Sequence, residues 1–418
     1  MKTNLLTFII LLLSITAHSQ STSILFVGNS YTGRNNLPKM TQDVALSTGD
    51  TITYQAHTPG GNRLLQHAAN PTVHGLIRSK SWDYVVLQAQ SQEPSFSLSQ
   101  VQQEVFPAAK ELCDSIRANN ACSTPLFYMT WGRKNGDSRN CPNLPYLCTY
   151  RGMDSALNLR YRIMADDNQA QVSPVGAVWN YIRTNHPAIE LYTADESHPS
   201  VAGTYAGACS FYTMILQKDP SFITFDAGLD PTEASTIRAA AKAVVFDSLA
   251  KWNVGKFAPK AEFGAIQTGR SFGFINLSGN ANSFSWDFGD SNTSNLLQPN
   301  HTYAQDGRYT VTLIATKCGK SDTFTQDVDY STVSIPALEE EIISLSPIPN
   351  PFTDVVKIAG VARMEIREVR FIGLDGKVIM AETSYNKTIH TSSLPVGIYT
   401  IEVVLRDGKR SYMKGLKL

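Results

Sequence analysis

Short apolar runs alternate with longer amphipathic stretches from Ser21 to about Asn253. The apolar runs are Ile24–Val27, Tyr84–Leu87, Leu126–Met129 and Val172–Val175. The stretches between them place apolar residues at helical spacing, as in Val101–Ala118, Met153–Ala165 and Val178–Arg183. Strands that alternate with helices predict a parallel sheet covered by helices on both faces. Ligands of such sheets bind beyond the carboxyl ends of the strands, so we expect any functional site there.

The pattern changes after Phe257, where apolar and polar residues alternate one by one. Ser283–Phe288 and Tyr309–Leu313 are examples, and turn residues separate such segments. A period of two with regular turns predicts a β-sandwich. A second break at Ile335–Leu338 is followed by three glutamates and then by further strand-like segments. We therefore predict an α/β domain over residues 20–255 and two small all-β domains over 258–335 and 340–418.

The first residues have the pattern of a secretory signal peptide. A basic start at Lys2 precedes the apolar run Leu5–Ile15, and small residues surround His18 at Ala17 and Ser19. This arrangement predicts a signal peptide over residues 1–19 that is removed after Ser19. The run is too short for a membrane span, which needs about 20 apolar residues. We expect an exported chain without a transmembrane anchor.

Charge and cysteine content narrow the class of protein further. The 418 residues include 36 Lys and Arg against 36 Asp and Glu, which gives no reason to expect nucleic acid as a partner. In an exported chain the six cysteines are disulfide candidates first. Cys113 with Cys122 and Cys141 with Cys148 are near pairs, and the second is favoured because it would brace a long loop. Two further cysteines, Cys209 and Cys318, are expected as single buried thiols. No spacing resembles a zinc site, so no metal or cofactor is expected.

Two segments near the ends of the α/β region carry candidate catalytic side chains. Ser30 follows the first apolar run, where its hydroxyl can reach the crevice and N–H groups of a following helix can stabilise an oxyanion. Asp195 and His198 are three residues apart, so one short turn can present both to the same side. A carboxylate that holds one imidazole nitrogen leaves the other to face a nucleophile. Helix capping and a surface histidine would explain the same residues, but their shared sheet edge favours a Ser-His-Asp triad.

From about residue 23 to 253 the chain resembles the SGNH, or GDSL-like, hydrolases. Gly28-Asn29-Ser30 matches their first block, Gly-Asp-Ser, with Asn in place of Asp, and Asp195 with His198 matches their last block, D-x-x-H. The resemblance implies a flavodoxin-like three-layer α/β/α fold and an esterase or deacetylase activity. It also implies that Ser30 is the nucleophile, that His198 is the general base and then acid, and that Asp195 orients the imidazole.

The resemblance further implies an oxyanion hole, part of which departs from the family pattern. Gly61 best matches the glycine N–H donor of the second block, with Gly60 as the alternative. The third block is normally G-x-N-D, but here it is Gln88-Ala89-Gln90-Ser91. Either Gln90 or Gln88 replaces the Asn donor, with a reach one methylene longer. Asn29 is a further candidate oxyanion or substrate-binding residue.

A loop after the apolar run Leu126–Met129 is a candidate wall of the substrate cleft. It begins at Trp131–Asp137 and continues to about Tyr146. Long loops at a crevice edge are often functional. Trp131 is a candidate platform for a sugar ring, and packing against the sheet is its alternative role.

The two β-domains also resemble known families. Residues 259–333 resemble a PKD domain through Trp286–Asp290, Pro299–Tyr303 and Gly307–Leu313. Residues 341–418 resemble a type IX secretion sorting domain through Leu345–Phe352, Leu374–Val378 and Leu394–Tyr399. The second resemblance implies export through the periplasm of a Gram-negative cell, with the outer-membrane secretion machinery as a partner.

These observations together predict a secreted or cell-surface serine hydrolase. Its expected substrates are small-molecule or glycan esters, above all acetyl esters of carbohydrates. A non-catalytic carbohydrate-binding or adhesive protein on an SGNH-like scaffold is the alternative, which the altered third block favours.

Overall fold

The computed structural model describes residues 21–268, 271–330, 346–359, 366–373, 376–383, 388–406 and 410–418. The signal peptide predicted over residues 1–19 and the break predicted around Ile335–Leu338 lie outside these ranges. The chain divides into two compact units, Met1–Ser331 and Thr332–Leu418. The described residues form three hydrophobic cores, one in the α/β region and one in each all-β region.

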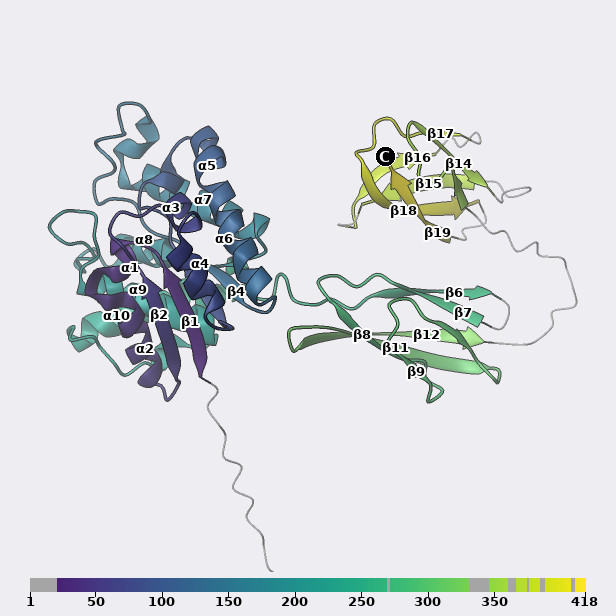
Figure 1. Cartoon of the computed structure of the whole chain (residues 1–418), viewed down its shortest axis with the longest axis horizontal. Helices are drawn as coiled ribbons and strands as arrows, with labels where there is room; N and C mark the ends of the chain where they lie inside the picture. The colour runs from purple at the N-terminus through teal and green to yellow at the C-terminus, as the bar shows by residue number, and fades with distance from the viewer. Residues whose placement is uncertain are drawn as a thin grey trace, which may run out of the picture. The chain divides into compact units, whose positions relative to one another are not determined.

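A five-stranded parallel sheet forms the centre of the α/β region (Figure 1). Its strand order is β2-β1-β3-β4-β5, which is the flavodoxin-like order. The strands are β1 Thr22–Val27, β2 Ile52–His57, β3 Tyr84–Leu87, β4 Thr124–Tyr128 and β5 Gln171–Ser173. The four apolar runs of the sequence correspond to β1, β3, β4 and β5. Strand β2 lies at the sheet edge and half of its residues are exposed, so it has no continuous apolar run.

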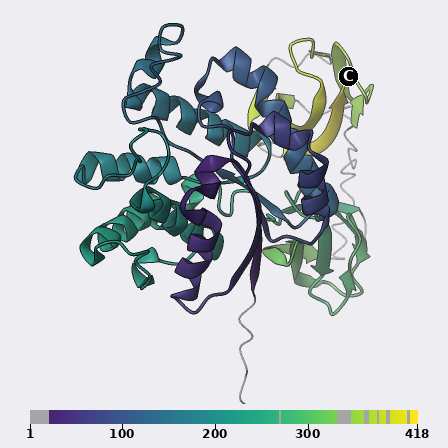
Figure 2. The same ribbon diagram turned by 60° about the vertical axis from the view of Figure 1, so that its left-hand side comes forward.

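Helices cover both faces of this sheet, as Figure 2 shows. One layer consists of α2 Leu37–Leu46, α8 Val175–Asn185, α9 Val201–Leu216 and α10 Pro231–Val244. The other consists of α3 Leu64–Ala68, α4 Pro71–Arg78, α5 Leu98–Glu104, α6 Phe106–Asn119 and α7 Tyr150–Asp167. The short helix α1 Ser30–Gly33 follows β1 directly. The predicted three-layer α/β/α fold is confirmed.

One predicted helix is divided in two. The pattern over Val101–Ala118 predicts a single helix, but α5 ends before Val105 and α6 begins at Phe106. Pro107 lies in the first turn of α6, where its missing N–H leaves no helical hydrogen bond unmade. Inside a continuous helix the same proline would clash with the preceding turn, so the chain starts a new helix.

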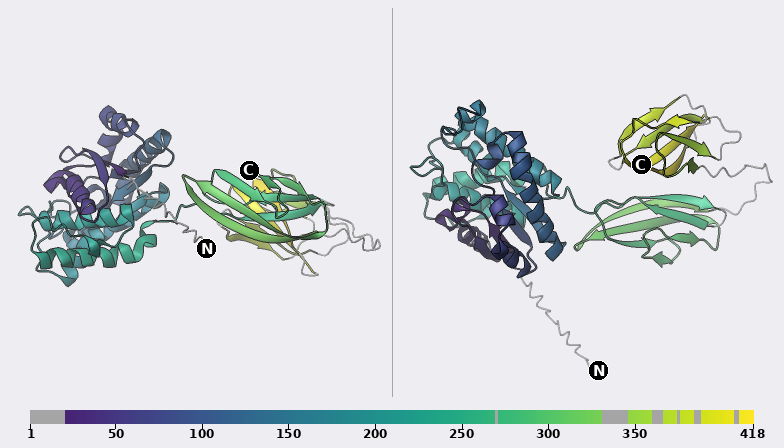
Figure 3. Two further views of the ribbon diagram at one scale, coloured as in Figure 1. Left: turned by 90° about the horizontal axis from the view of Figure 1, so that it is seen from below. Right: turned by 45° about the horizontal axis from the view of Figure 1, so that its top comes forward.

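The region after the α/β core is a β-sandwich of two antiparallel sheets, as predicted (Figure 3). Buried aromatic residues from both sheets, such as Phe274 and Trp286, fill its core. Asp287 accepts a hydrogen bond from the Gly289 N–H, and Asp290 contacts His301, as in a structural turn. The strands are β6 Phe263–Thr268, β7 Ser271–Asn276, β8 Ser283–Asp287, β9 Thr293–Ser294, β10 Asn300–Thr302, β11 Gly307–Lys317 and β12 Lys320–Tyr330.

The C-terminal unit is also built from antiparallel strands. Its two sheets have the strand orders β13-β14-β17 and β16-β15-β18-β19. Phe352, Phe371 and Ile401 are fully buried in its core. The strands are β13 Ser346–Ile348, β14 Val355–Ala359, β15 Ile366–Ile372, β16 Val378–Glu382, β17 Ile389–His390, β18 Gly397–Leu405 and β19 Arg410–Lys417. The prediction of two all-β regions is confirmed.

The cysteine pairing differs in part from the sequence expectation. Cys141 and Cys148 form the expected disulfide. Cys318 is not a single thiol, because it is bonded to Cys122, and Cys113 and Cys209 are the buried free cysteines. Cys122 precedes β4, while Cys318 lies in the turn between β11 and β12, so the bond links the α/β region to the β-sandwich. Their separation of 196 residues explains why spacing pointed to the nearer Cys113.

Peptide mapping without reduction tests this pairing. We expect cross-linked peptides that contain Cys122 with Cys318 and Cys141 with Cys148. Cys113 and Cys209 are buried in the core, so an alkylating reagent should modify them only after denaturation. A peptide that joins Cys113 to Cys122 would contradict the structure and support the expectation from spacing.

Candidate active site

Five segments meet at the carboxyl edge of the parallel sheet. Four of them follow β1, β2, β3 and β4, and the fifth, residues 193–200, leads into α9. Gly28 stands at the end of β1, where a Cβ would lie 2.4 Å from Thr32 Oγ1 and 2.8 Å from Gln88 Oε1. Only glycine fits this close approach, which lets the chain turn directly from β1 into α1. Ser30 is thereby placed at the first position of α1, at the sheet edge.

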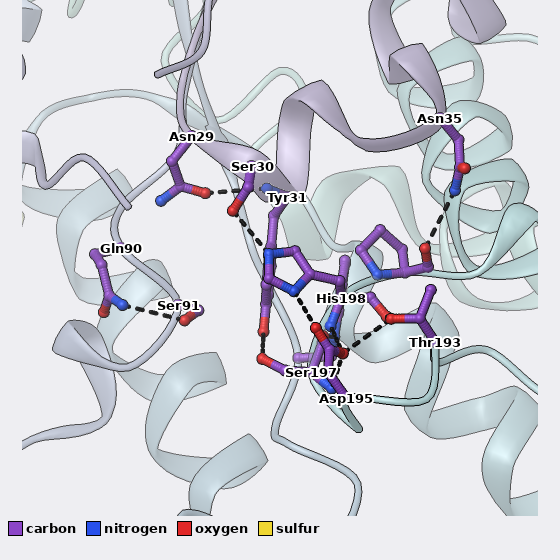
Figure 4. A network of polar contacts seen from close by, with 12 residues as sticks. Asn29, Ser30, Tyr31, Asn35, Gln90, Ser91, Thr193, Asp195, Ser197 and His198 are labelled. Carbon is purple, nitrogen blue, oxygen red and sulfur yellow. Dashed lines mark hydrogen bonds and ion pairs between the residues drawn. The ribbon is translucent and has the colours of Figure 1, made fainter. Parts of the chain in front are cut away.

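The structure brings Ser30, His198 and Asp195 into a continuous chain of contacts, drawn in Figure 4. Ser30 Oγ lies 2.8 Å from His198 Nε2, and His198 Nδ1 lies 2.5 Å from Asp195 Oδ2. The two ring nitrogens therefore have different partners. If Nδ1 carries the proton toward the carboxylate, Nε2 is free to accept the serine proton.

Asp195 is fixed by more than the imidazole. Its Oδ1 accepts hydrogen bonds from the N–H groups of Ser197 and His198 and from the Thr193 hydroxyl. Burial would raise the pKa of Asp195, but the hydrogen bonds from His198, Ser197 and Thr193 outweigh it and hold the pKa well below its usual range. The carboxylate therefore stays ionised at neutral pH and fixes the orientation of the ring.

A buried pair of amides joins Asn29 to Gln88. Gln88 Oε1 accepts from the Asn29 N–H at 3.0 Å and from the Thr32 hydroxyl at 2.8 Å. Gln88 Nε2 donates to Asn29 Oδ1 at 2.9 Å and to the Ala89 carbonyl at 2.6 Å. Gln88 is completely buried and both of its N–H groups are in use. This arrangement assigns Gln88 a structural place beneath α1, so the expectation that it completes an oxyanion hole is wrong.

Gln90 and Gly61 lie at the open side of the site. Gln90 Oε1 accepts from the N–H groups of Gln92 and Glu93, which fixes the side-chain carbonyl. Its Nε2 makes only long contacts, 3.3 Å to Ser91 Oγ and 3.5 Å to Gln92 Oε1. In the view of Figure 4, Gln90 lies on the other side of Ser30 from His198. Gly61 is exposed and has a φ of +73°, a left-handed conformation that favours glycine.

Trp131 is completely buried, so the expectation that it forms a sugar platform is wrong. Its ring stacks between Tyr31 and Trp179, with centroid distances of 4.8 Å and 3.7 Å. Its Nε1 donates to the Ser197 carbonyl at 3.1 Å. Trp131 therefore has a structural role. It contacts Tyr31, which follows Ser30, and Ser197, which precedes His198.

Further contacts hold the two catalytic segments together. The Tyr31 hydroxyl lies 2.6 Å from Ser197 Oγ, and burial raises the pKa of Tyr31, which keeps this hydroxyl protonated. Asn35 Nδ2 donates to the Pro199 carbonyl at 3.1 Å and to the Ser200 carbonyl at 3.0 Å. No sequence motif pointed to Tyr31 or Asn35, because their partners lie more than 160 residues away.

The loop that begins at Trp131 lies at this edge of the sheet, as predicted. The Lys134 N–H donates to the Glu196 carbonyl at 3.0 Å, and Asn135 Nδ2 donates to Glu196 Oε2 at 2.9 Å. Asp137 is buried and accepts from Gln92 Nε2 at 2.6 Å, which ties the loop to the segment after β3. The loop therefore braces both neighbouring segments of the site.

Two findings concern ligands and membranes. Among the residues that the structure describes, no group of three or more His, Cys, Asp or Glu side chains is arranged to hold a metal ion. The helices of the described ranges also include none with the length and apolar character of a membrane span.

Comparisons with protein families identify the two β-regions. Residues 263–333 match the PKD domain, and residues 348–416 match the secretion system C-terminal sorting domain. The chain thus carries a sorting domain for a secretion system, which makes it a secreted or cell-surface protein. Comparison with curated proteins gives no match.

Solved structures similar to the α/β region include SGNH and GDSL-like hydrolases. A DUF4886 family protein from Bacteroides uniformis is 16% identical, with a TM-score of 0.48, over 56% of this chain and 97% of that one. A predicted SGNH hydrolase from Slackia heliotrinireducens is 24% identical, with a TM-score of 0.38, over 46% of this chain and 98% of that one.

A solved PKD domain is also similar to part of this chain. This domain of a Vibrio cholerae metalloprotease is 38% identical, with a TM-score of 0.17, over 18% of this chain and 99% of that one.

The structural place of Trp131 can be tested by its effect on stability. Replacing Trp131 by Ala should lower the free energy of unfolding by about 3–5 kcal/mol, because the cavity would lie within a buried ring stack. Phe222 is 73% exposed, so Phe222→Ala is a matched control that should stay within about 0.5 kcal/mol of the wild type. Urea unfolding followed by circular dichroism measures both. Equal stability of Trp131→Ala and wild type would contradict the buried placement.

Proposed function

We propose that this protein is a secreted serine ester hydrolase of the SGNH type. The observation that carries the proposal is the chain of contacts from Ser30 Oγ through both nitrogens of His198 to Asp195. A serine with an imidazole at hydrogen-bond distance, itself oriented by a carboxylate, is the arrangement that activates a hydroxyl for acyl transfer.

The proposed reaction begins with attack of Ser30 Oγ on the acyl carbonyl while His198 Nε2 takes the hydroxyl proton. The developing oxyanion accepts hydrogen bonds from the N–H groups of Ser30 and Gly61 and from the Gln90 amide. His198 then gives its proton to the leaving alcohol, and an acyl-enzyme remains. Water activated by His198 attacks the acyl group, releases the acid and restores the Ser30 hydroxyl. Asp195 stabilises the imidazolium in both steps.

The proposed substrates are acetyl esters, above all those of carbohydrates. The open surroundings of the site support a short acyl group. A Cβ added at Gly60 or Gly61 would have no atom within 4 Å, and the Asp195 side chain is 49% exposed. A long alkyl chain would gain little burial in such surroundings. The carbohydrate itself is inferred from the combination of an exported hydrolase with an accessory β-sandwich.

The proposed route to the cell exterior uses both ends of the chain. The signal peptide predicted over residues 1–19 would direct export to the periplasm of a Gram-negative cell. The C-terminal sorting domain would then engage a type IX secretion machinery at the outer membrane. Together these elements would place the hydrolase outside the cell, where it can reach polymeric esters.

Replacing Ser30 by Ala tests the nucleophile. Turnover of an aryl acetate should fall by on the order of 10⁴–10⁶-fold, because the covalent step is lost. Ser271 lies in β7 of the β-sandwich, so Ser271→Ala is a matched control with unchanged turnover. A fluorophosphonate should label Ser30 in the wild type and in the control. Near wild-type turnover of Ser30→Ala would show that Ser30 is not the nucleophile. Glycan binding without any label would instead favour the non-catalytic alternative.

A series of p-nitrophenyl esters from acetate to octanoate tests the preference for short acyl groups. A chain that became buried would gain about 0.8 kcal/mol, roughly fourfold in kcat/KM, for each methylene. The open site predicts that kcat/KM stays level or falls along the series. Acetate release from an acetylated polysaccharide should accompany this result. A steady rise with chain length and activity on lipid esters only would contradict the proposed substrate class.

A further inference from the structure

The segment 60–63, between β2 and α3, is exposed at its two glycines. Gly60 and Gly61 are exposed, and side-chain positions built on them would meet no atom within 4 Å. Glycine also has the greatest backbone freedom of all residues. A Gly61 N–H that must point at one oxyanion position therefore needs neighbours that fix the segment from its flanks.

The first such neighbour is Asn29. Its Nδ2 donates to the Asn62 carbonyl at 3.0 Å, directly after Gly61. Its Oδ1 accepts from the Tyr31 N–H and from Gln88 Nε2, which fixes the orientation of the amide. Asn29 is 2% exposed, so its direction is set by the packing around α1. An aspartate of the same shape would keep the two accepted hydrogen bonds but would have no N–H for the Asn62 carbonyl.

The second neighbour is an ion pair between segments that follow β2 and β3. The Arg63 guanidinium contacts the carboxylates of Glu93 and Glu104. The Glu93 side chain is 7% exposed, whereas that of Glu104 is 39% exposed. The Glu93 N–H donates to Gln90 Oε1 at 3.3 Å. Arg63 is thus the last residue of the segment that contains Gly61, and it is joined through Glu93 to the side chain of Gln90.

We propose that Asn29 and the Arg63–Glu93 ion pair are positioning residues for the oxyanion hole. They hold the Gly61 N–H and the Gln90 amide at a fixed distance from each other and from Ser30. This inference rests on the proposed function. The inference gives a reason for the burial of Glu93 at this edge of the sheet. Burial raises the pKa of Glu93, and Arg63 opposes that rise. A small displacement of such donors is costly, since an error of about 1 Å can reduce turnover about 100-fold.

Glu93→Gln tests the ion pair with little change of shape, and Glu104→Gln is its matched control. Glu93→Gln should lower kcat on an aryl acetate about 10- to 100-fold with KM nearly unchanged, because donors to the oxyanion act mainly in the transition state. Glu104→Gln removes only the exposed partner and should stay within about twofold of the wild type. The rate of fluorophosphonate labelling of Ser30 should fall in parallel with kcat.

Arg63 and Asn29 provide independent variants. Arg63→Ala should lose activity like Glu93→Gln, and added guanidinium ion should restore part of it, because the Arg63 side chain is 37% exposed. Arg63→Lys should retain more activity than Arg63→Ala. Asn29→Asp should lower kcat about 10- to 100-fold through the loss of one donated hydrogen bond. Thermal unfolding of each variant separates these effects from a loss of the fold.

The outcomes distinguish this inference from the proposed function. Loss of activity in Ser30→Ala, together with wild-type kcat in folded Glu93→Gln and Arg63→Ala, would overturn the positioning role only. Equal losses in Glu93→Gln and Glu104→Gln would also overturn it, as would a change confined to KM. Full activity of Ser30→Ala would instead overturn the proposed function.

Discussion

The stack of Tyr31, Trp131 and Trp179 is the packing interaction on which the site geometry depends. Ser30 and His198 are 168 residues apart, yet their side chains lie 2.8 Å from each other. The buried stack spans this separation, because Tyr31 follows Ser30 and the Trp131 indole donates to the carbonyl of Ser197. Large buried rings have few alternative positions in a close-packed interior. The close-packed core therefore fixes the positions of the two segments that carry Ser30 and His198.

The buried amides of Asn29 and Gln88 also fix the position of α1 at the end of β1. Each supplies the donor or acceptor that the other needs, so two uncharged polar side chains are buried with their hydrogen bonds made. Gln88 supports α1 from below, while Gln90, two residues further on, remains at the open side with an amide that is only weakly engaged.

Much of the fold could be predicted from the sequence because its signals are local. Each buried strand of a parallel sheet forms its own apolar run, and the change to period-two alternation marks the start of the β-sandwich. The edge strand β2 was missing from the apolar runs because half of its side chains face solvent. Candidate catalytic residues were also found locally, since Ser30 follows a strand end and Asp195 and His198 are separated by one turn.

The sequence by itself determined the order of the elements, the three regions of the chain and the residue types able to carry acyl-transfer chemistry. Only the tertiary structure decided that Cys318 pairs with Cys122, that Trp131 is buried and that Gln88 has no free N–H group. The physical reason is that backbone preference and hydrophobic pattern act between near neighbours. Disulfide bonds, ring stacks and buried amide pairs instead join residues that meet only when the sheet and its helices have packed.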